Sequence, residues 1–400
     1  MIRLKGMRIP ISEPIPTPPE VRLFAKPLVA AGDLVSAGQL IGQALEIGLP
    51  IHASVSGKVK TIDDFDPITG EKVPSIVISS DGEQAHHDIL TPPVISNTAE
   101  CLNALQSSGA VGFDGIKSAT DKLDYILINA VECEPYVTSD ARAMIDNAED
   151  ILEGAVLLMK HINPKQLIIC IGDNNPEAIE KMKGLMPSVD GISVRSLPSK
   201  YPQGHDKVLV QKVVGSMTDI GCAVVSSTAV SVLTNYVKTG MPYTHRVITV
   251  GGSGVKTTKN LIVPLGTAIK YLFDYCGGLT DDATEIIMGG PMTGKAVPSL
   301  DMHLTKTQNA VLALNENDSE PAHVTACIKC GRCISGCPMK LMPSFIEDAF
   351  EQKNIDMLGK LQVNLCIECG NCAYLCPAKR PLAQVMSLSA KMLVGDAGKC

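Results

Sequence analysis

The C-terminal quarter of the chain carries one cysteine pattern twice, as Cys327-Ile-Lys-Cys330-Gly-Arg-Cys333-Ile-Ser-Gly-Cys337-Pro338 and as Cys366-Ile-Glu-Cys369-Gly-Asn-Cys372-Ala-Tyr-Leu-Cys376-Pro377. In a C-x2-C-x2-C-x3-C-P run, three thiolates on a tight loop hold one 4Fe–4S cluster and the fourth reaches the other cluster. We therefore predict two clusters. The predicted ligands of the first are Cys327, Cys330, Cys333 and Cys376, and those of the second are Cys366, Cys369, Cys372 and Cys337.

Two structural zinc sites are the alternative, but C-x2-C pairs would suffice for zinc and would leave the remaining cysteines of each run unexplained. Residues 342–363 have apolar side chains at helical period, which predicts two short helices between the cluster loops. Lys329 and Glu368 occupy equivalent places in the two runs with opposite charge. This difference indicates unequal reduction potentials for the two clusters.

Composition limits the class of protein. The 400 residues are too many for a single core and predict two to four domains, and 45% hydrophobic with 19% charged residues is typical of a globular chain. A formal charge of −7 without basic clusters argues against nucleic-acid binding. No stretch has the ~18 apolar residues of a membrane span, and the first residues lack the apolar core of a signal peptide. We expect a cytoplasmic protein, with peripheral membrane association left open.

Eight of the fourteen cysteines lie in the two runs, which indicates metal ligation in a reducing compartment rather than a disulfide framework. The other six are isolated, and most of them are expected to be small core residues. Cys133 is the exception, because it lies where a strand is expected to end and is a candidate for lining a site. The isolated cysteines are Cys101, Cys133, Cys170, Cys222, Cys276 and Cys400.

The middle of the chain has the pattern of a parallel sheet with helical crossovers. Residues 124–131 and 166–172 are apolar runs, and 138–162 between them has the period of one long amphipathic helix. Asn174-Asn175-Pro176-Glu177 then starts another helix, and 222–227 precedes a further one. We predict a Rossmann-like α/β domain over 86–240, with its ligand at the carboxyl ends of the strands.

Glu132 and Glu134 follow the first of these strands directly, and a glycine-bearing loop, Gly109–Gly115, precedes it. The loop could approach a flat or phosphorylated cofactor, although three glycines in seven residues also fit a plain turn. These residues form the candidate site of the α/β domain.

The flanking segments have the punctuation of small β domains. Residues 1–85 have short β-rich pieces broken by Gly-Asp, Ala-Gly and Ser-Gly, which predicts a barrel-sandwich (lipoyl-like) domain. No lysine occupies a carrier hairpin tip, so we predict no swinging arm. Residues 245–278 alternate through two strands and a short helix, within a β-grasp domain at 241–310 that we interpret as a spacer. The cluster domain is predicted over 315–400.

In this order of parts the chain resembles the RnfC family, which belongs to the Rnf complex, the ion-translocating ferredoxin:NAD oxidoreductase. The resemblance covers nearly the whole chain. Its marks are GDLVSAGQLIG, INAVECEPYVTSDARAM, KYPQGHDK, LIVPLGT within an SLBB-like segment, IMGGPMTGKAV and the twin cysteine runs.

The resemblance implies that the central domain is like the flavin-binding domain of the NADH-oxidising subunit of complex I. FMN would take a hydride from NADH and pass single electrons to the clusters and to other redox subunits. The positions that match the family's flavin site are Gly112, Gly115, Asn129, Glu132 and Glu134.

The chain departs from the family pattern at the glycine loop. Where the family has a loop like G-L-G-G-A-G-F-P-T, this chain has Gly112-Phe-Asp-Gly115-Ile-Lys-Ser-Ala-Thr. Asp114 opposes an anionic or closely approaching cofactor, and Lys117 could partly compensate. His205-Asp206 stands where the family tends to have Gly-Glu, and we interpret His205 as a surface histidine. Two alternatives therefore stay open: a flavin-free electron relay of another reductase, and an iron–sulfur sensor or adaptor.

Overall fold

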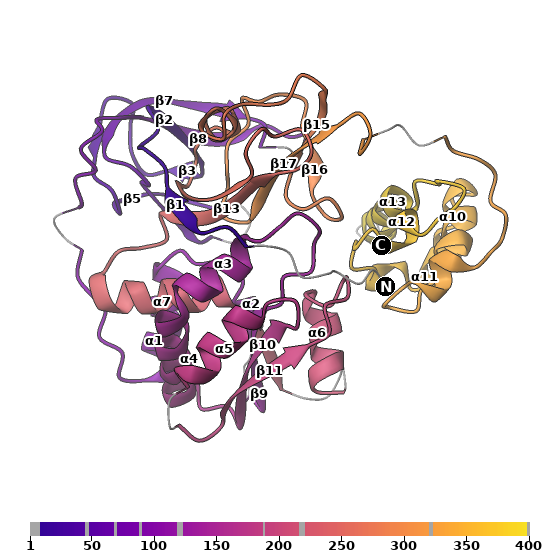
Figure 1. Cartoon of the computed structure of the whole chain (residues 1–400), viewed down its shortest axis with the longest axis horizontal. Helices are drawn as coiled ribbons and strands as arrows, with labels where there is room; N and C mark the ends of the chain where they lie inside the picture. The colour runs from indigo at the N-terminus through magenta and orange to yellow at the C-terminus, as the bar shows by residue number, and fades with distance from the viewer. Residues whose placement is uncertain are drawn as a thin grey trace.

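A computed structural model describes residues 9–44, 48–67, 70–87, 90–117, 123–186, 189–215, 221–319 and 323–397, with side chains to 394. Two β-rich parts lie together, an α/β part lies below them in the view of Figure 1, and a small helical module lies beside this body. None of the helices in these ranges is both long and apolar enough to cross a membrane.

The N-terminal part consists of two small antiparallel sheets around an aliphatic core. One sheet has the order β2-β8-β7-β4 and the other β3-β5-β6. Val21, Ile41, Ile76 and Ile78 have no exposed surface, and they hold the two sheets together. The strands are β2 (Glu20–Phe24), β3 (Lys26–Pro27), β4 (Leu34–Val35), β5 (Leu40–Gln43), β6 (Pro50–His52), β7 (Gly57–Phe65) and β8 (Val73–Ser80).

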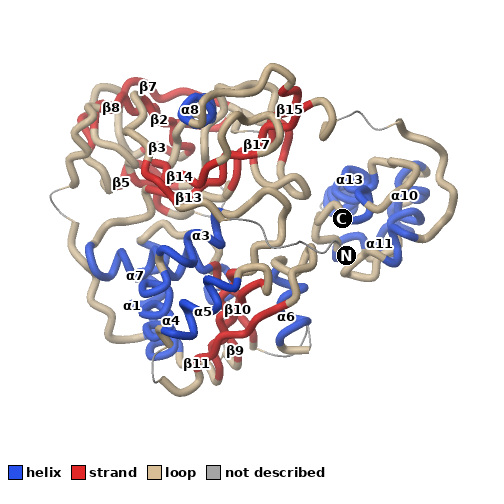
Figure 2. Tube along the Cα trace, in the orientation of Figure 1, coloured by secondary structure: helices blue, strands red, loops and turns tan. Residues whose placement is uncertain are grey.

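The α/β part is a four-stranded parallel sheet in the order β11-β10-β9-β12. Helices α1, α3, α4, α5 and α7 contribute to the core on one face, and α6 packs on the other (Figure 2). The elements are α1 (Thr98–Ser107), α2 (Asp114–Lys117), β9 (Tyr125–Ala130), α3 (Ser139–Asp146), α4 (Ala148–Ile162), β10 (Gln166–Gly172), α5 (Pro176–Gly184), β11 (Ile192–Leu197), α6 (Asp206–Val213), β12 (Cys222–Ser226) and α7 (Ser227–Thr239).

The single long helix predicted over 138–162 is wrong in one respect, because Asn147 divides it into α3 and α4. Asn147 has φ −105° and ψ 27°, outside helical geometry, so the chain turns between the two helices. The predicted start at Asn175-Pro176 is present, and the Asn175 side chain accepts a hydrogen bond from the Ala178 N–H.

The two faces of the parallel sheet have different coverings. In β9, Ile126 and Ile128 belong to the helix-covered core, whereas Leu127 points to the opposite face. The core on that second face includes Ile367 and Cys369 of the helical module. The module therefore completes the covering of the sheet, which a parallel sheet needs on both faces.

The third part is a six-stranded mixed sheet in the order β1-β14-β13-β17-β15-β16. Its first strand, β1 (Ser12–Pro14), comes from the segment predicted as part of the N-terminal domain and pairs in parallel with β14. The predicted boundary at 310 falls at the start of β17, so the sheet continues to 315. The other elements are β13 (His245–Gly251), β14 (Lys259–Pro264), α8 (Ile269–Tyr275), β15 (Ala283–Met288), β16 (Lys295–Ala296) and β17 (Ala310–Asn315).

The helical module contains two cysteine loops with the same backbone. Gly331 and Gly370 both have φ +72°, and Lys329 and Glu368 have φ +53° and +51°. Each loop leads into a one-turn helix, and longer helices pack around both, including the two expected between the loops. The elements are α9 (Arg332–Ser335), α10 (Pro343–Glu351), α11 (Ile355–Lys360), the 3-10 turn η1 (Val363–Leu365), α12 (Asn371–Tyr374) and α13 (Leu382–Ala397).

Candidate functional site

Each predicted set of four cysteines lines one cavity of the helical module. We call the cavity of Cys337, Cys366, Cys369 and Cys372 the inner cage, because it lies against the body. The outer cage is the cavity of Cys327, Cys330, Cys333 and Cys376. Four thiols around one cavity are the donor set of a 4Fe–4S cluster, so the residues present fit two such clusters.

The inner cage is fixed to the body by direct contacts. The buried Tyr201 hydroxyl donates a hydrogen bond of 2.6 Å to the carbonyl oxygen of Cys369. Gly370 lies so close to the loop before β16 that an added Cβ would be 2.8 Å from the carbonyl oxygen of Met292. Only glycine fits at this approach, because a side chain would displace the loop.

A crevice of about 250 Å³ lies at the carboxyl ends of the parallel strands. It is lined by three predicted site residues, Asn129, Glu132 and Glu134, and also by Cys369 of the inner cage. Cys133, the isolated cysteine singled out from the sequence, lines it too. Burial raises the pKa of the Cys133 thiol to about 12, so the thiol stays neutral there.

Glu132 sits in an acidic, buried corner of this crevice. Its carboxyl accepts a hydrogen bond of 3.1 Å from the Asp140 N–H. Burial, and next the charge of Asp140, raise the pKa of Glu132 well above its ordinary value, with a further contribution from Glu134. Glu132 is therefore disposed to keep its proton.

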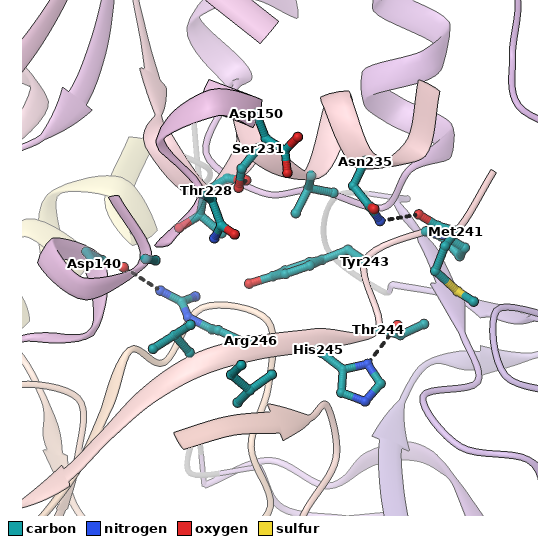
Figure 3. A pocket seen from close by; sticks show the side chains of 16 residues that line it. Asp140, Asp150, Thr228, Ser231, Asn235, Met241, Tyr243, Thr244, His245 and Arg246 are labelled. Carbon is teal, nitrogen blue, oxygen red and sulfur yellow. Dashed lines mark hydrogen bonds and ion pairs between the residues drawn. The ribbon is translucent and has the colours of Figure 1, made fainter. Parts of the chain in front are cut away.

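Asp140 connects the crevice with a second cavity of about 300 Å³ between α3, α7 and β13. Figure 3 shows Arg246 reaching from β13 toward Asp140, at 3.6 Å. Asn309 also donates a hydrogen bond to Asp140, at 3.2 Å. The charge of Asp140 is thus partly compensated from the side away from Glu132.

Glu134 holds a loop rather than pointing freely into the crevice. Its carboxylate accepts hydrogen bonds from the Met292 N–H, at 2.9 Å, and from the Thr293 hydroxyl. Met292 is the residue whose carbonyl lies against Gly370. Glu134 therefore connects the crevice mechanically to the inner cage.

The two predicted glycines lie beside the crevice instead of lining it. The Gly112 carbonyl accepts a hydrogen bond of 2.8 Å from the Ser226 N–H, and Ser226 lines the crevice. A Cβ added to Gly115 would lie 3.1 Å from the Val224 N. In this chain both glycines bring the loop close to β12.

Lys306, which the sequence did not single out, holds the start of the same loop. Its ammonium donates to the carbonyl oxygens of Gly109 and Pro50, at 2.7 and 2.8 Å. Burial lowers the pKa of Lys306 to about 7. Three parts of the molecule therefore meet at this side chain.

The polar groups of the crevice fit a flavin in their donor chemistry. Asn129 and Ser226 stand at its edge, and the buried Gln203 Nε2, within the loop that walls it, has no partner in the described part of the chain. The volume is slightly below the ~300–1,000 Å³ of typical cofactor pockets. The KYPQG motif had no role assigned from the sequence, and the structure places its Tyr201 and Gln203 at this wall.

His205 also lines the crevice and is half-buried, which corrects its interpretation as a surface histidine. Its Nδ1 accepts from the Lys207 N–H at the start of α6, and burial lowers its pKa. Cys101, Cys170 and Cys276 are buried core residues as expected. Cys400 lies outside the described residues.

Family models match four segments in chain order. They are the RnfC barrel sandwich hybrid domain at 3–83, the Nuo51 FMN-binding domain at 110–241, the SLBB domain at 247–296 and the 4Fe-4S dicluster domain at 326–379. These matches confirm the predicted fold class and the resemblance stated from the motifs.

Curated relatives, all RnfC proteins, match over most of the chain. The one from the proton-translocating ferredoxin:NAD(+) oxidoreductase complex of Clostridium ljungdahlii is 35% identical, over 88% of this chain and 80% of its own. The one from the ion-translocating oxidoreductase complex of Rhodobacter capsulatus is 32% identical, over 85% and 70%. The Na(+)-translocating counterpart of Acetobacterium woodii is 30% identical, over 82% and 79%.

Among solved structures, an NAD+-reducing NiFe hydrogenase in the H2-reduced state is similar with a TM-score of 0.52. It is 13% identical and the match covers 77% of this chain and 67% of that one. At this identity the likeness concerns the fold alone.

Proposed function

Because the chain belongs to the RnfC family of ion-translocating ferredoxin:NAD(+) oxidoreductase complexes, we propose that it moves electrons between a nicotinamide, a flavin in the crevice and two iron–sulfur clusters. Its partners are other redox subunits of an Rnf-like complex. We place it at the periphery of a membrane, on the cytoplasmic face.

One observation carries this proposal: Cys369 lines both the crevice and the inner cage. Crevice and cage therefore share a wall. In the proposal, Cys337, Cys366, Cys369 and Cys372 ligate the cluster next to the crevice. The second cluster, on Cys327, Cys330, Cys333 and Cys376, leads away from the body.

FMN bound in the crevice would accept a hydride and release its electrons one at a time, which nicotinamides alone do not do. Asn129 and Gln203 have amide groups suited to the polar edge of the ring, and Gly112 and Gly115 allow the loop to come close. Glu132, kept protonated by burial, adds no negative charge to a site that receives electrons.

The test is to purify the protein anaerobically and to quantify iron, sulfide and acid-released FMN in one sample, before and after adding NADH. We expect about eight irons per chain, from the two four-iron clusters, with one flavin bleached by NADH. Eight irons with no flavin and no response to NADH would overturn the nicotinamide step and favour the flavin-free relay.

A matched variant sharpens this test. Asp114→Asn removes the carboxylate that opposes an anionic cofactor at the glycine loop. We expect at least the wild-type flavin content in this variant. A lower content would mean that Asp114 supports the loop instead of opposing the cofactor.

A further inference from the structure

The outer cage is open to solvent in a way that the inner cage is not. Residues 323–330, which include the ligands Cys327 and Cys330, form eight consecutive exposed positions. In the inner cage Cys369 is buried, and Cys337, Cys366 and Cys372 are half-buried. A cluster in the outer cage would thus lie at the surface on the side of these eight residues.

The rim of the outer cage is basic, although the whole chain carries a formal charge of −7. Lys329 and Arg332 are exposed, and neither forms an ion pair within the ranges that the structure describes. Two acidic residues line this cage. Glu347 is buried and paired with Arg380, at 2.7 Å, so only the exposed Asp348 offsets the two cations.

Large apolar side chains stand among these charges. Ile328, between the ligand Cys327 and Lys329, is 67% exposed, and Phe345 on the opposite wall is 53% exposed. An apolar centre with a charged rim is the usual anatomy of a transient protein interface. We call Ile328, Lys329, Arg332 and Phe345 the basic patch.

We propose that the basic patch is the docking site of an acidic protein that carries one electron at a time on its own redox centre. The proposal rests on the proposed function, since it supplies the exit of the electron route. One electron leaves the reduced outer cluster, which is oxidised, and reduces the centre of the carrier. No bond or proton is transferred.

Charge complementarity selects this occupant. Lys329 and Arg332 attract an acidic surface, and electrostatic steering raises association rates by about 10- to 1,000-fold while making them sensitive to salt. Contact at Ile328 would bring the carrier beside two cluster ligands. A basic carrier would be repelled at the same place.

The experiment reduces the holoprotein with dithionite and follows its reoxidation by stopped flow. The probes are an acidic bacterial two-cluster ferredoxin in its oxidised form and basic cytochrome c, each at low and high salt. We expect the ferredoxin rate to fall at least ~10-fold from low to high salt. Lys329→Glu with Arg332→Glu is expected to slow the ferredoxin reaction at least ~10-fold at low salt and to speed the cytochrome c reaction.

Lys353→Glu with Lys360→Glu is the matched control, because it changes the net charge equally on exposed residues that line neither cage. It should keep the wild-type rates. Dithionite replaces NADH, so failure of the nicotinamide step would leave this test intact. Equal slowing by both double variants, or wild-type rates without salt dependence, would overturn the docking site. If the patch variant lost iron, the wild-type salt dependence would decide alone.

Discussion

The loops at 327–333 and 366–372 have the same cysteine spacing and the same left-handed glycine at φ +72°, yet they face different surroundings. The second loop contacts the body through Tyr201 and Met292, whereas the first is exposed. The difference teaches that spacing determines what each loop can hold, while the contacts of its backbone determine where the electrons go.

The strongest test of this difference removes one ligand from each cage. Cys369→Ser should lose the inner cluster, about four of the eight irons, and should slow NADH-driven reduction of the outer cluster at least ~100-fold. Cys330→Ser should lose the outer cluster but leave the inner one reducible by NADH. Iron analysis and electron paramagnetic resonance distinguish the two, and the opposite outcome would reverse our order of the cages.

Glu132 predicts a pH dependence on the crevice side alone. Its pKa is raised in the folded protein, so the folded state binds the proton more tightly and stability falls as pH rises from ~4.3 through the folded pKa. The slope is at most about 1.4 kcal/mol per pH unit for one proton. Chemical unfolding at several pH values should show a smaller slope in Glu132→Gln, and an unchanged slope would contradict the buried acid.

Tyr201→Phe removes the hydroxyl that the Cys369 carbonyl accepts, and leaves a buried acceptor unpaired. We expect a loss of about 1–3 kcal/mol in the free energy of unfolding. Tyr374→Phe, on an exposed tyrosine of the same module, should stay within about 0.5 kcal/mol. Urea unfolding measures both, and equal losses would show that the Tyr201 bond does not distinguish the inner cage.

Glu134→Gln weakens the link between the crevice and the inner cage more mildly. The amide keeps one acceptor oxygen for the Met292 N–H and Thr293 hydroxyl but loses the charge, at a cost of about 1 kcal/mol. Hydrogen exchange should quicken at 289–294 and not at 323–330. Glu177→Gln, on an exposed glutamate of α5, is the control, and faster exchange there as well would indicate a general effect.

The smallest effect concerns the exposed charges beside the two cages. Glu368→Lys should raise the reduction potential of the inner cluster slightly, because a cation favours the more negative reduced form. Salt should diminish the shift, since Glu368 is exposed. Redox titration before and after the change measures it, and a shift to lower potential would contradict the electrostatic account.

Local patterns in the sequence predicted the parts but not their mutual contacts. The cysteine spacing, the apolar strand runs and the Asn175-Pro176 helix start all depend on neighbouring residues. The Tyr201–Cys369 bond joins residues 168 positions apart, so no local pattern could show it. Asn147 interrupts a helix whose apolar period continues across it, because periodicity reports the buried face and not the backbone angle.

The candidate site was predictable in the same measure. Asn129, Glu132 and Glu134 follow one strand and therefore come together at its end. Gly112 depends on how the loop packs against β12, which the sequence did not reveal. The roles of KYPQG and GGPMTG were also hidden, because each motif acts by touching a different part of the chain.

The pairing of β1 with β14 constrains how this protein emerges from the ribosome. Ser12 pairs with Asn260, so one of the first strands to be synthesised waits for a partner made about 250 residues later. At about 5–20 residues per second, this delay is on the order of 10–50 s. During that time the edge of β1 is unpaired in the nascent chain, and a chaperone that shields it would protect the growing polypeptide from aggregation.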